Sequence, residues 1–260
     1  MKYVSKKIKT GIHGLDEVLF GGIPKGAIVL VSGATGTGKT ILCLEFVYNG
    51  AKLFKEPGVF LSTEQNEEDL KNQLKSFGWN CDFLIKKNLL HLEKIDVGKS
   101  DDVVEKVTEI VKKTKAKRLV VDSLTTLTEF LSPAEIERKD GVELIKTVEK
   151  IFPIPLSEGL VTKSILFRLM ESLKELKCTT LVTSELPEKG NWLSRDTVSE
   201  FICDGVIEMR YLGIAGSDMR NLRVRKMRYS DHMKAYVPYV ITKRKGIVLK
   251  PEEAMAVLMR

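Results

Sequence analysis

Long apolar runs are missing from this 260-residue chain, and cysteine is scarce. No apolar stretch reaches the roughly 20 residues of a membrane-spanning helix, and the basic start, MKYVSKKIKTG, lacks the apolar segment of a secretion signal. The four cysteines, Cys43, Cys81, Cys178 and Cys203, form no C-x-x-C pair, which argues against a zinc or redox site. We therefore expect a cytoplasmic protein with reduced thiols and no membrane partner.

The residues that are present indicate a folded, soluble protein. Apolar residues make up 43% of the chain and charged residues 30%, which excludes a disordered composition. The length suits one large domain, and we predict a single domain over residues 1–260, although length alone leaves two smaller domains open. The net charge of +7 permits contact with nucleic acid. It supports only non-specific attraction, and a solvated lysine-rich surface explains it equally well.

Short apolar runs alternate with longer segments of helical periodicity. This alternation is typical of an α/β protein with a mostly parallel, twisted sheet covered by helices on both faces. The predicted strands of this part are 27–32, 58–62, 89–92, 118–121 and 179–183. One predicted helix is capped by Asn66 and has Leu70, Leu74 and Phe77 on one face, and another opens at Asp101 and runs to about residue 113.

The pattern changes after Cys203. Strand-like stretches follow at 205–211, 221–228, 236–242 and 246–250, with Gly213, Gly216 and Ser217 as a hairpin-type connection between the first two. We therefore predict an antiparallel C-terminal extension of the sheet. The segment 131–160 has the least regular pattern, and we interpret it as an insertion, a mobile segment or a partner surface.

A glycine-rich stretch follows the first predicted strand and matches the motif G-x-x-x-x-G-K-[ST]. Glycines allow the backbone to wrap a bulky polyphosphate with N–H groups, and the helix that follows adds free N–H donors. Lys39 would then bridge the β- and γ-phosphates of ATP, and the Thr40 hydroxyl would bind Mg²⁺. The residues predicted to contact the nucleotide here are Gly33, Thr35, Gly36, Thr37, Gly38, Lys39, Thr40 and Ile41.

Two carboxylates end neighbouring predicted strands. Asp122 follows a buried strand, where nucleotide-binding sheets hold the acid that binds magnesium through water. Glu64 follows another and is our candidate for the catalytic base, although an acid there also favours the helix that Asn66 caps. Ser184 and Glu185 end a further strand at the same edge and could sense the γ-phosphate.

Several further segments carry a family resemblance. The stretches TGIHGLD (10–16) and GGIPKG (21–26), the glycine-rich motif, SFGW (76–79), VDS (121–123), DGVI (204–207) and KMRYSDH (226–232) resemble KaiC-type ATPases of the RecA/RadA superfamily. The resemblance implies a RecA-like P-loop NTPase core, a single domain of the archaeal kind, and a ring, commonly a hexamer, with ATP between neighbouring subunits. It also implies nucleotide contacts by Ser76 and, in the adjacent subunit's site, by Lys226, Met227, Arg228, Ser230 and His232.

The basic segment has its own chemical logic. In a regular strand Leu222, Val224, Lys226 and Arg228 share one face, so two cations are presented together. Such a pair could neutralise charge developing on a γ-phosphate, as an arginine finger does. The alternative is an ordinary basic strand at a solvated edge, which discourages aggregation.

One position departs from the family. KaiC domains usually carry two successive glutamates where this chain has Glu64 and Gln65, and a glutamine cannot take a proton from water. If the second acid is the effective base in the family, turnover here would be slow or absent.

The sequence leaves three functions to weigh. The first is a Mg²⁺-dependent ATPase with a regulatory or signalling role, in which autophosphorylation stays open. The second is an ATP-binding switch or protein-interaction module with little turnover. The third is a RadA-like DNA-binding ATPase using the stretch 186–192, whose charges nearly cancel.

Overall fold

The computed structural model describes residues 6–96, 103–130, 158–187, 192–214 and 217–258. Its elements, in chain order, are β1 (Lys7–Ile8), α1 (Leu15–Val18), β2 (Ile23–Pro24), β3 (Ile28–Gly33), α2 (Lys39–Leu53), β4 (Gly58–Ser62), α3 (Glu67–Ser76), α4 (Asp82–Lys86), β5 (Leu90–Lys94), α5 (Val103–Thr114), β6 (Arg118–Asp122), α6 (Leu124–Phe130), α9 (Glu158–Glu175), β7 (Thr179–Glu185), α10 (Ser199–Ile202), β8 (Gly205–Ile214), β9 (Ser217–Met227), β10 (Val237–Thr242), β11 (Gly246–Leu249) and α11 (Pro251–Leu258).

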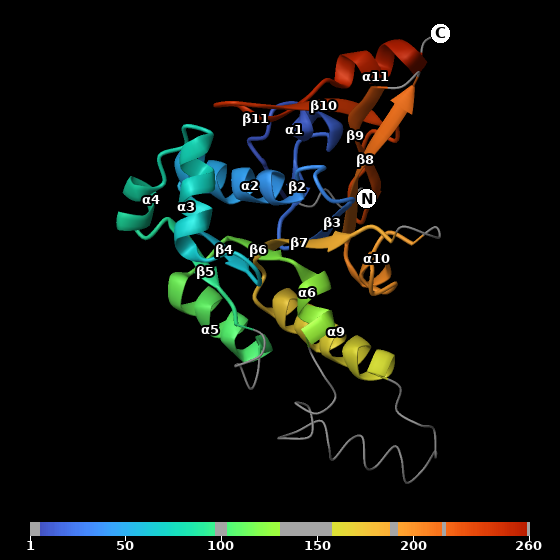
Figure 1. Cartoon of the computed structure of the whole chain (residues 1–260). Coiled ribbons are helices and arrows are strands. Elements are labelled where there is room, and N and C mark those ends of the chain that lie inside the picture. Colours follow the sequence, from blue (N-terminus) through green and yellow to red (C-terminus); the bar gives the residue numbers. More distant parts are fainter. Residues whose placement is uncertain (1–5, 97–102, 131–157, 188–191, 215–216, 259–260) are drawn as a thin grey trace.

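A nine-stranded sheet in the order β11-β10-β9-β8-β3-β7-β6-β4-β5 organises these elements. The strands from β8 to β5 in this order run parallel to their neighbours, whereas β9, β10 and β11 are joined antiparallel at the other edge (Figure 1). The predicted α/β class, the mostly parallel sheet and the antiparallel C-terminal extension are therefore confirmed. Parallel strands end together, so the ends of β3, β4, β6 and β7 meet at one edge of the sheet.

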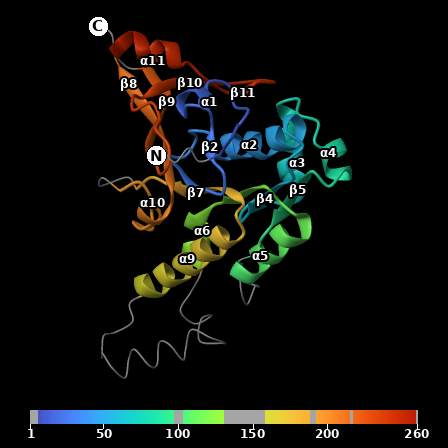
Figure 2. The same ribbon diagram turned by 180° about the vertical axis from the view of Figure 1, so that it is seen from behind.

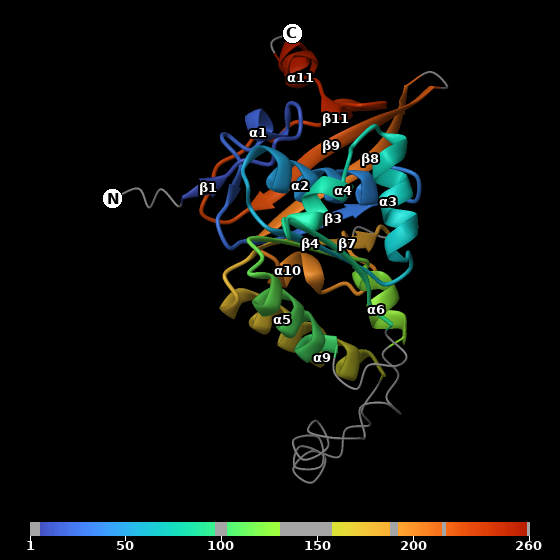
Figure 3. The same ribbon diagram turned by 90° about the vertical axis from the view of Figure 1, so that its left-hand side faces the viewer.

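Successive side chains of the central strands point alternately into two apolar cores, one on each face of the sheet. Val29 and Val31 of β3 face a core with Phe46 of α2, while Ile28 and Leu30 face a second core on the other side of the sheet. Helices α1, α2 and α3 cover the first face, and α5, α6 and α9 cover the second (Figures 1 and 3). The view from behind shows the same two layers, with α11 beside β10 (Figure 2). The β3 strand is thus buried on both faces, which explains its continuous apolar sequence.

Local predictions are largely confirmed. The Asn66 side chain accepts a hydrogen bond from the Asp69 backbone N–H at 3.0 Å and caps α3, although Phe77 lies just past the helix end. The hairpin prediction is wrong in detail, because β8 and β9 extend far enough to include Gly213 and Ser217. Asp101 and Gly216, like most of the segments 131–160 and 186–192, lie outside the described residues, and 158–160 open α9.

The four cysteines are free and buried, as expected for reduced thiols that pack in the core. In the described part of the chain, no helix combines the length and the apolar character needed to cross a membrane.

Candidate functional site

The glycine-rich loop connects β3 to α2 at the edge where the parallel strands end. A Cβ atom on Gly33 would lie 2.7 Å from both the Met209 carbonyl oxygen and Thr37 Oγ1, so only glycine fits there. Gly38 has a φ of 99° and precedes α2, whose first turn receives no side-chain cap. The first N–H groups of this 15-residue helix are therefore available to an anion.

Lys39 and Thr40 open α2 and point into the site. Lys39 Nζ donates to the carbonyl oxygens of Gly33 and Ala34, at 2.8 and 3.2 Å. Burial lowers the pKa of Lys39, and the nearby carboxylates of Glu185 and Asp122 act in the opposite direction. The lysine is thus a poorly solvated cation on a loop of backbone dipoles, a suitable position for binding phosphate.

Asp122 ends β6 and is held by two hydroxyl groups. Thr40 Oγ1 donates to its Oδ2 at 2.8 Å, and Thr183 Oγ1 donates to its Oδ1 at 2.5 Å. Burial raises the pKa of Asp122, while the two donated hydrogen bonds lower it. A hydroxyl next to a carboxylate is a hard-oxygen pair that suits Mg²⁺. Among the described residues no group of three His, Cys, Asp or Glu side chains could hold a metal, so phosphate and water would have to complete the ligand set.

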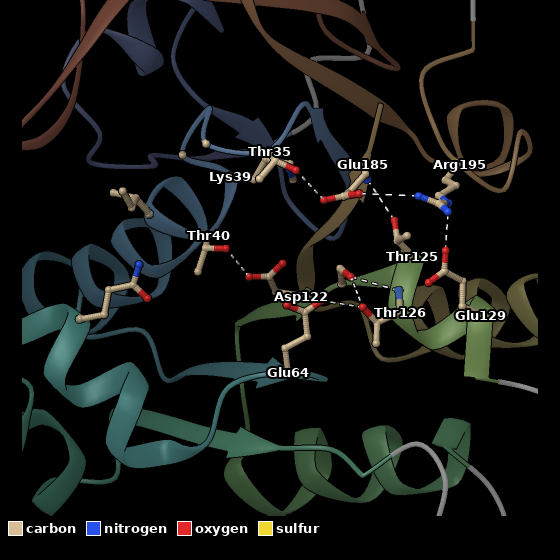
Figure 4. Close-up of a pocket in the computed structure, with 15 residues that line it drawn as sticks. Thr35, Lys39, Thr40, Glu64, Asp122, Thr125, Thr126, Glu129, Glu185 and Arg195 are labelled. Carbon is tan, nitrogen blue, oxygen red and sulfur yellow. Dashed lines mark hydrogen bonds and ion pairs between the residues drawn. The ribbon is translucent and has the colours of Figure 1, made fainter. Parts of the chain in front are cut away.

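Glu64 lies just after β4 and faces the same space. Its Oε1 accepts a hydrogen bond from Thr126 Oγ1 at 2.7 Å (Figure 4). The backbone N–H groups of Glu64 and Gln65 both donate to Ser62 Oγ, which fixes the turn that aims Glu64. Glu64 lines the cavity described next, whereas Gln65 is not among its lining residues. Of the two adjacent side chains, the glutamate is the one that shares this cavity with the P-loop.

These groups border one cavity of about 440 Å³ at the carboxyl edge of the sheet. It brings together most of the residues predicted from the P-loop and the two carboxylates: Thr35, Gly36, Gly38, Lys39, Thr40, Ile41, Glu64 and Asp122. Gly33 and Thr37 are buried directly behind it. Of the two residues that end β7, Glu185 lines the cavity and accepts a hydrogen bond from Thr35 at 3.1 Å, whereas Ser184 is buried and accepts one from the Arg195 N–H.

Sequence reasoning missed part of the cavity wall. Gln73 of α3 lines it with an unpartnered amide oxygen, and Thr125 and Thr126 of α6 follow the Asp122 strand closely enough that they could have been found. Arg195 gave no local signal. Its guanidinium pairs with Glu129 at 2.9 Å and lies 3.9 Å from Glu185, so only the fold brings it to the site (Figure 4).

Lys226 and Arg228 lie elsewhere, and their predicted strand face is wrong. Arg225 is an extra residue in the β8–β9 pairing, since Lys226 pairs with Val206 while Val224 pairs with Ile207. This bulge reverses the alternation, so Lys226 lies on the opposite face from Val224. The two cations are nevertheless presented together, because Lys226 Nζ and an Arg228 guanidinium nitrogen both donate to the Phe201 carbonyl, at 3.3 and 3.1 Å.

The other predicted contact residues lie outside the cavity lining as well. Ser76 is exposed at the end of α3, where its hydroxyl donates to the Gln73 carbonyl. The Met227 side chain is buried in the first core, so a nucleotide contact there would use its backbone. Ser230 Oγ donates to the Asp231 carbonyl, and His232 Nδ1 lies 3.0 Å from the Met233 carbonyl oxygen.

Comparison with known proteins gives a consistent result. A family model described as "ATPase: KaiC" matches residues 8–154 and 147–254. The circadian clock oscillator proteins KaiC of Parathermosynechococcus lividus and of Nostoc sp. (strain PCC 7120) are 31% and 33% identical to this chain over 98% of its length. These alignments cover 44% and 46% of the two relatives, so the chain spans less than half of their length.

A solved structure is similar over its whole length. The KaiC-like protein PH0186 from the hyperthermophilic archaeon Pyrococcus horikoshii is 32% identical, with a TM-score of 0.77, and the match covers 95% of this chain and 100% of that one. The P-loop, the acid at the end of β6 and the sheet order therefore occur together with a family match over most of the chain. This chain belongs to the KaiC family and has its RecA-like, ATP-binding P-loop ATPase fold.

Proposed function

We propose that this chain is a Mg²⁺-dependent ATPase that acts as a ring, with each active site completed by a neighbouring copy. The observation that supports this proposal most strongly is the convergence of Lys39, Thr40, Asp122 and Glu64 on one cavity behind the glycine-rich loop. These are a phosphate-binding cation, a metal-binding hydroxyl and carboxylate, and a candidate base, from three different stretches of the chain. We also propose that residues 1–260 form one domain, and that it acts in the cytoplasm.

The residues would divide the work as follows. Backbone N–H groups of the loop and of the first turn of α2 would bind the β- and γ-phosphates, with Lys39 offsetting their charge. Thr40 and Asp122 would hold Mg²⁺, which neutralises charge on the phosphate oxygens when it is bound. Their direct hydrogen bond of 2.8 Å keeps the two ligand groups side by side.

Hydrolysis requires a water molecule aligned with the γ-phosphate. Glu64 would accept the proton of that water as its oxygen bonds to the γ-phosphorus, and the bond from this phosphorus to the bridging oxygen of ADP would break. Thr126 holds the Glu64 carboxylate through its hydroxyl, so the base is oriented before substrate binds. Glu64 lines the cavity and Gln65 does not, which supports Glu64 as the base although the second glutamate of the family is missing.

The neighbouring copy would contribute Lys226 and Arg228. Neither lines this chain's own cavity, yet both point their cationic groups at one carbonyl of α10 and lie at least partly exposed. A pair of cations that does not serve its own site is suited to another copy's γ-phosphate. Together with family membership, this supports the ring, which we propose to be hexameric, and a regulatory role exerted through a protein partner.

The proposal is tested by steady-state phosphate release. Lys39→Ala should lower the rate at least about 100-fold, because it removes the cation aimed at the transferring phosphate. Lys112→Ala is the matched control, since Lys112 is an exposed lysine on α5, on the opposite face of the sheet. Removal of Mg²⁺ by a chelator should abolish turnover in the wild type. Equal rates for Lys39→Ala and the wild type would refute the assignment.

A second candidate function is an ATP-operated switch with little turnover, and Gln65 in place of a glutamate is the observation that favours it. Single-turnover measurement separates the two functions. Hydrolysis of bound ATP within minutes would support the enzyme, and ATP retained intact for hours would support the switch.

A further inference from the structure

Two tyrosine hydroxyls from the antiparallel extension donate to consecutive carbonyls of the glycine-rich loop. Tyr211 Oη donates to the Gly36 carbonyl oxygen at 2.7 Å, and Tyr239 Oη donates to the Thr37 carbonyl oxygen at 2.6 Å. Neither tyrosine lines the cavity, so neither belongs to the site as described above.

The order of the strands in the sheet places both hydroxyls next to the glycine-rich loop. Met209 of β8 pairs with Gly33 at the end of β3, so Tyr211, two residues further on, runs alongside the loop. Arg220 is the cross-strand partner of Tyr211, lies over its ring at 5.4 Å and adds a second, longer contact to the Gly36 carbonyl at 3.5 Å. Tyr239 comes from β10 and is only 3% exposed.

The planar peptide group links each of these carbonyl contacts to the direction of the next residue's N–H. In a trans peptide the N–H points opposite to the C=O of the preceding residue. Fixing the Thr37 carbonyl toward Tyr239 therefore aims the N–H of Gly38 away from Tyr239, and Gly38 lines the cavity. Fixing the Gly36 carbonyl likewise orients the Thr37 N–H, which closes the loop by donating to the Ala34 carbonyl at 3.3 Å.

We propose that Tyr239 and Tyr211 are positioning residues that hold the glycine-rich loop in its polyphosphate-binding conformation. The affinity of the chain for nucleoside di- and triphosphates then depends on two hydroxyls outside the site. This inference rests on the nucleotide site of the proposed function. Burial raises the pKa of Tyr239 well above its ordinary value of 10.0, so its hydroxyl keeps the proton that it donates.

The test compares three tyrosine-to-phenylalanine variants of the full chain, each of which removes a hydroxyl and keeps the ring. Tyr239→Phe should raise the Kd of Mg-ATP and Mg-ADP in titration calorimetry about 5- to 10-fold, the loss expected for one buried hydrogen bond. Tyr211→Phe should raise it about 2- to 5-fold, since Tyr211 is 36% exposed. Tyr236→Phe is the control: it removes a hydrogen bond to Glu208 at 3.1 Å in the same extension and should leave both Kd values unchanged.

Melting temperature without nucleotide separates positioning from general stability. The proposal expects Tyr211→Phe to melt within the range of Tyr236→Phe while binding Mg-ATP more weakly, and this variant carries the test should Tyr239→Phe fail to fold. Unchanged Kd values in both loop variants, or an equal loss in Tyr236→Phe, would overturn the proposal. A wild type that binds no Mg-ATP would instead contradict the proposed function itself.

Discussion

The P-loop cavity and the basic segment 226–232 differ in how much of their chemistry one chain supplies. At the cavity Thr40, Thr183 and Thr126 hold the Asp122 and Glu64 carboxylates, so the acidic groups have their partners before any ligand binds. In the basic segment, Lys226 and Arg228 donate to backbone carbonyls of α10, and Arg228 also forms a half-exposed ion pair with Asp204 at 3.5 Å. Neither cation reaches that cavity. We therefore propose that the first region is the part of the site that one copy supplies, and that the second completes the site of another copy.

Arg228→Ala is the substitution with the largest expected effect on activity if the two regions act in different copies. If Arg228 acts on a neighbour's nucleotide, steady-state hydrolysis should fall about 1,000-fold, as for known arginine fingers. The Kd of ATP should change little, because the P-loop of each copy is intact.

Arg168→Ala on α9 is the matched control, since it removes an exposed arginine on another element. If Arg228→Ala hydrolyses ATP at the wild-type rate, the basic segment is an ordinary solvated strand edge and not a trans-acting group.

Glu64→Gln tests which of the two adjacent positions supplies the base. Phosphate release should fall about 100-fold or more while ATP still binds, because the amide cannot accept the proton. Gln65→Ala should lower the rate less than about 3-fold, as expected for a side chain outside the reacting site. Were Gln65→Ala the more damaging change, as measured by the same phosphate-release assay, the assignment of Glu64 would be wrong.

Glu45 is a buried carboxyl that joins helix α2 to strand β11 of the antiparallel extension. It lies on α2 behind the P-loop and accepts a hydrogen bond from the Ile247 N–H of β11 at 2.9 Å. Burial raises the pKa of Glu45 from 4.5 to about 8, against the opposing hydrogen bonds from Ile247 and Asn49. The folded state therefore binds a proton that the unfolded state releases above pH 4.5, and stability falls as pH rises from there to about 8.

Glu45→Gln should remove that pH dependence. Between pH 4.5 and about 8, the free energy of unfolding of the variant, measured with denaturant, should fall less steeply with pH than that of the wild type. The difference in slope should be up to about 1.4 kcal/mol per pH unit. The glutamine oxygen can still accept the Ile247 N–H, so the variant should fold. Parallel slopes in the two proteins would show that Glu45 is already ionised in the fold.

The sequence was most informative where function imposes a local pattern. The P-loop motif, Asp122 and Glu64 each end a strand, and parallel strands end at the same edge, so their convergence could be predicted. Arg195 and the two loop-binding tyrosines could not, because their positions depend on the chain's path after β7 and on the pairing of β8 with β3. The face of Lys226 was predicted wrongly, because one extra residue in β9 reverses the alternation and no turn residue marks it.

The most direct test of the central claim mixes two inactive variants. Lys39→Ala lacks a working P-loop and keeps Arg228, while Arg228→Ala keeps the P-loop and lacks the trans cation. In a mixed ring, some interfaces join an intact P-loop from one variant to an intact Arg228 from the other, so phosphate release should reappear on mixing. Differently tagged subunits would verify that mixed assemblies form. If these assemblies remain as inactive as either variant alone, the result would contradict the account.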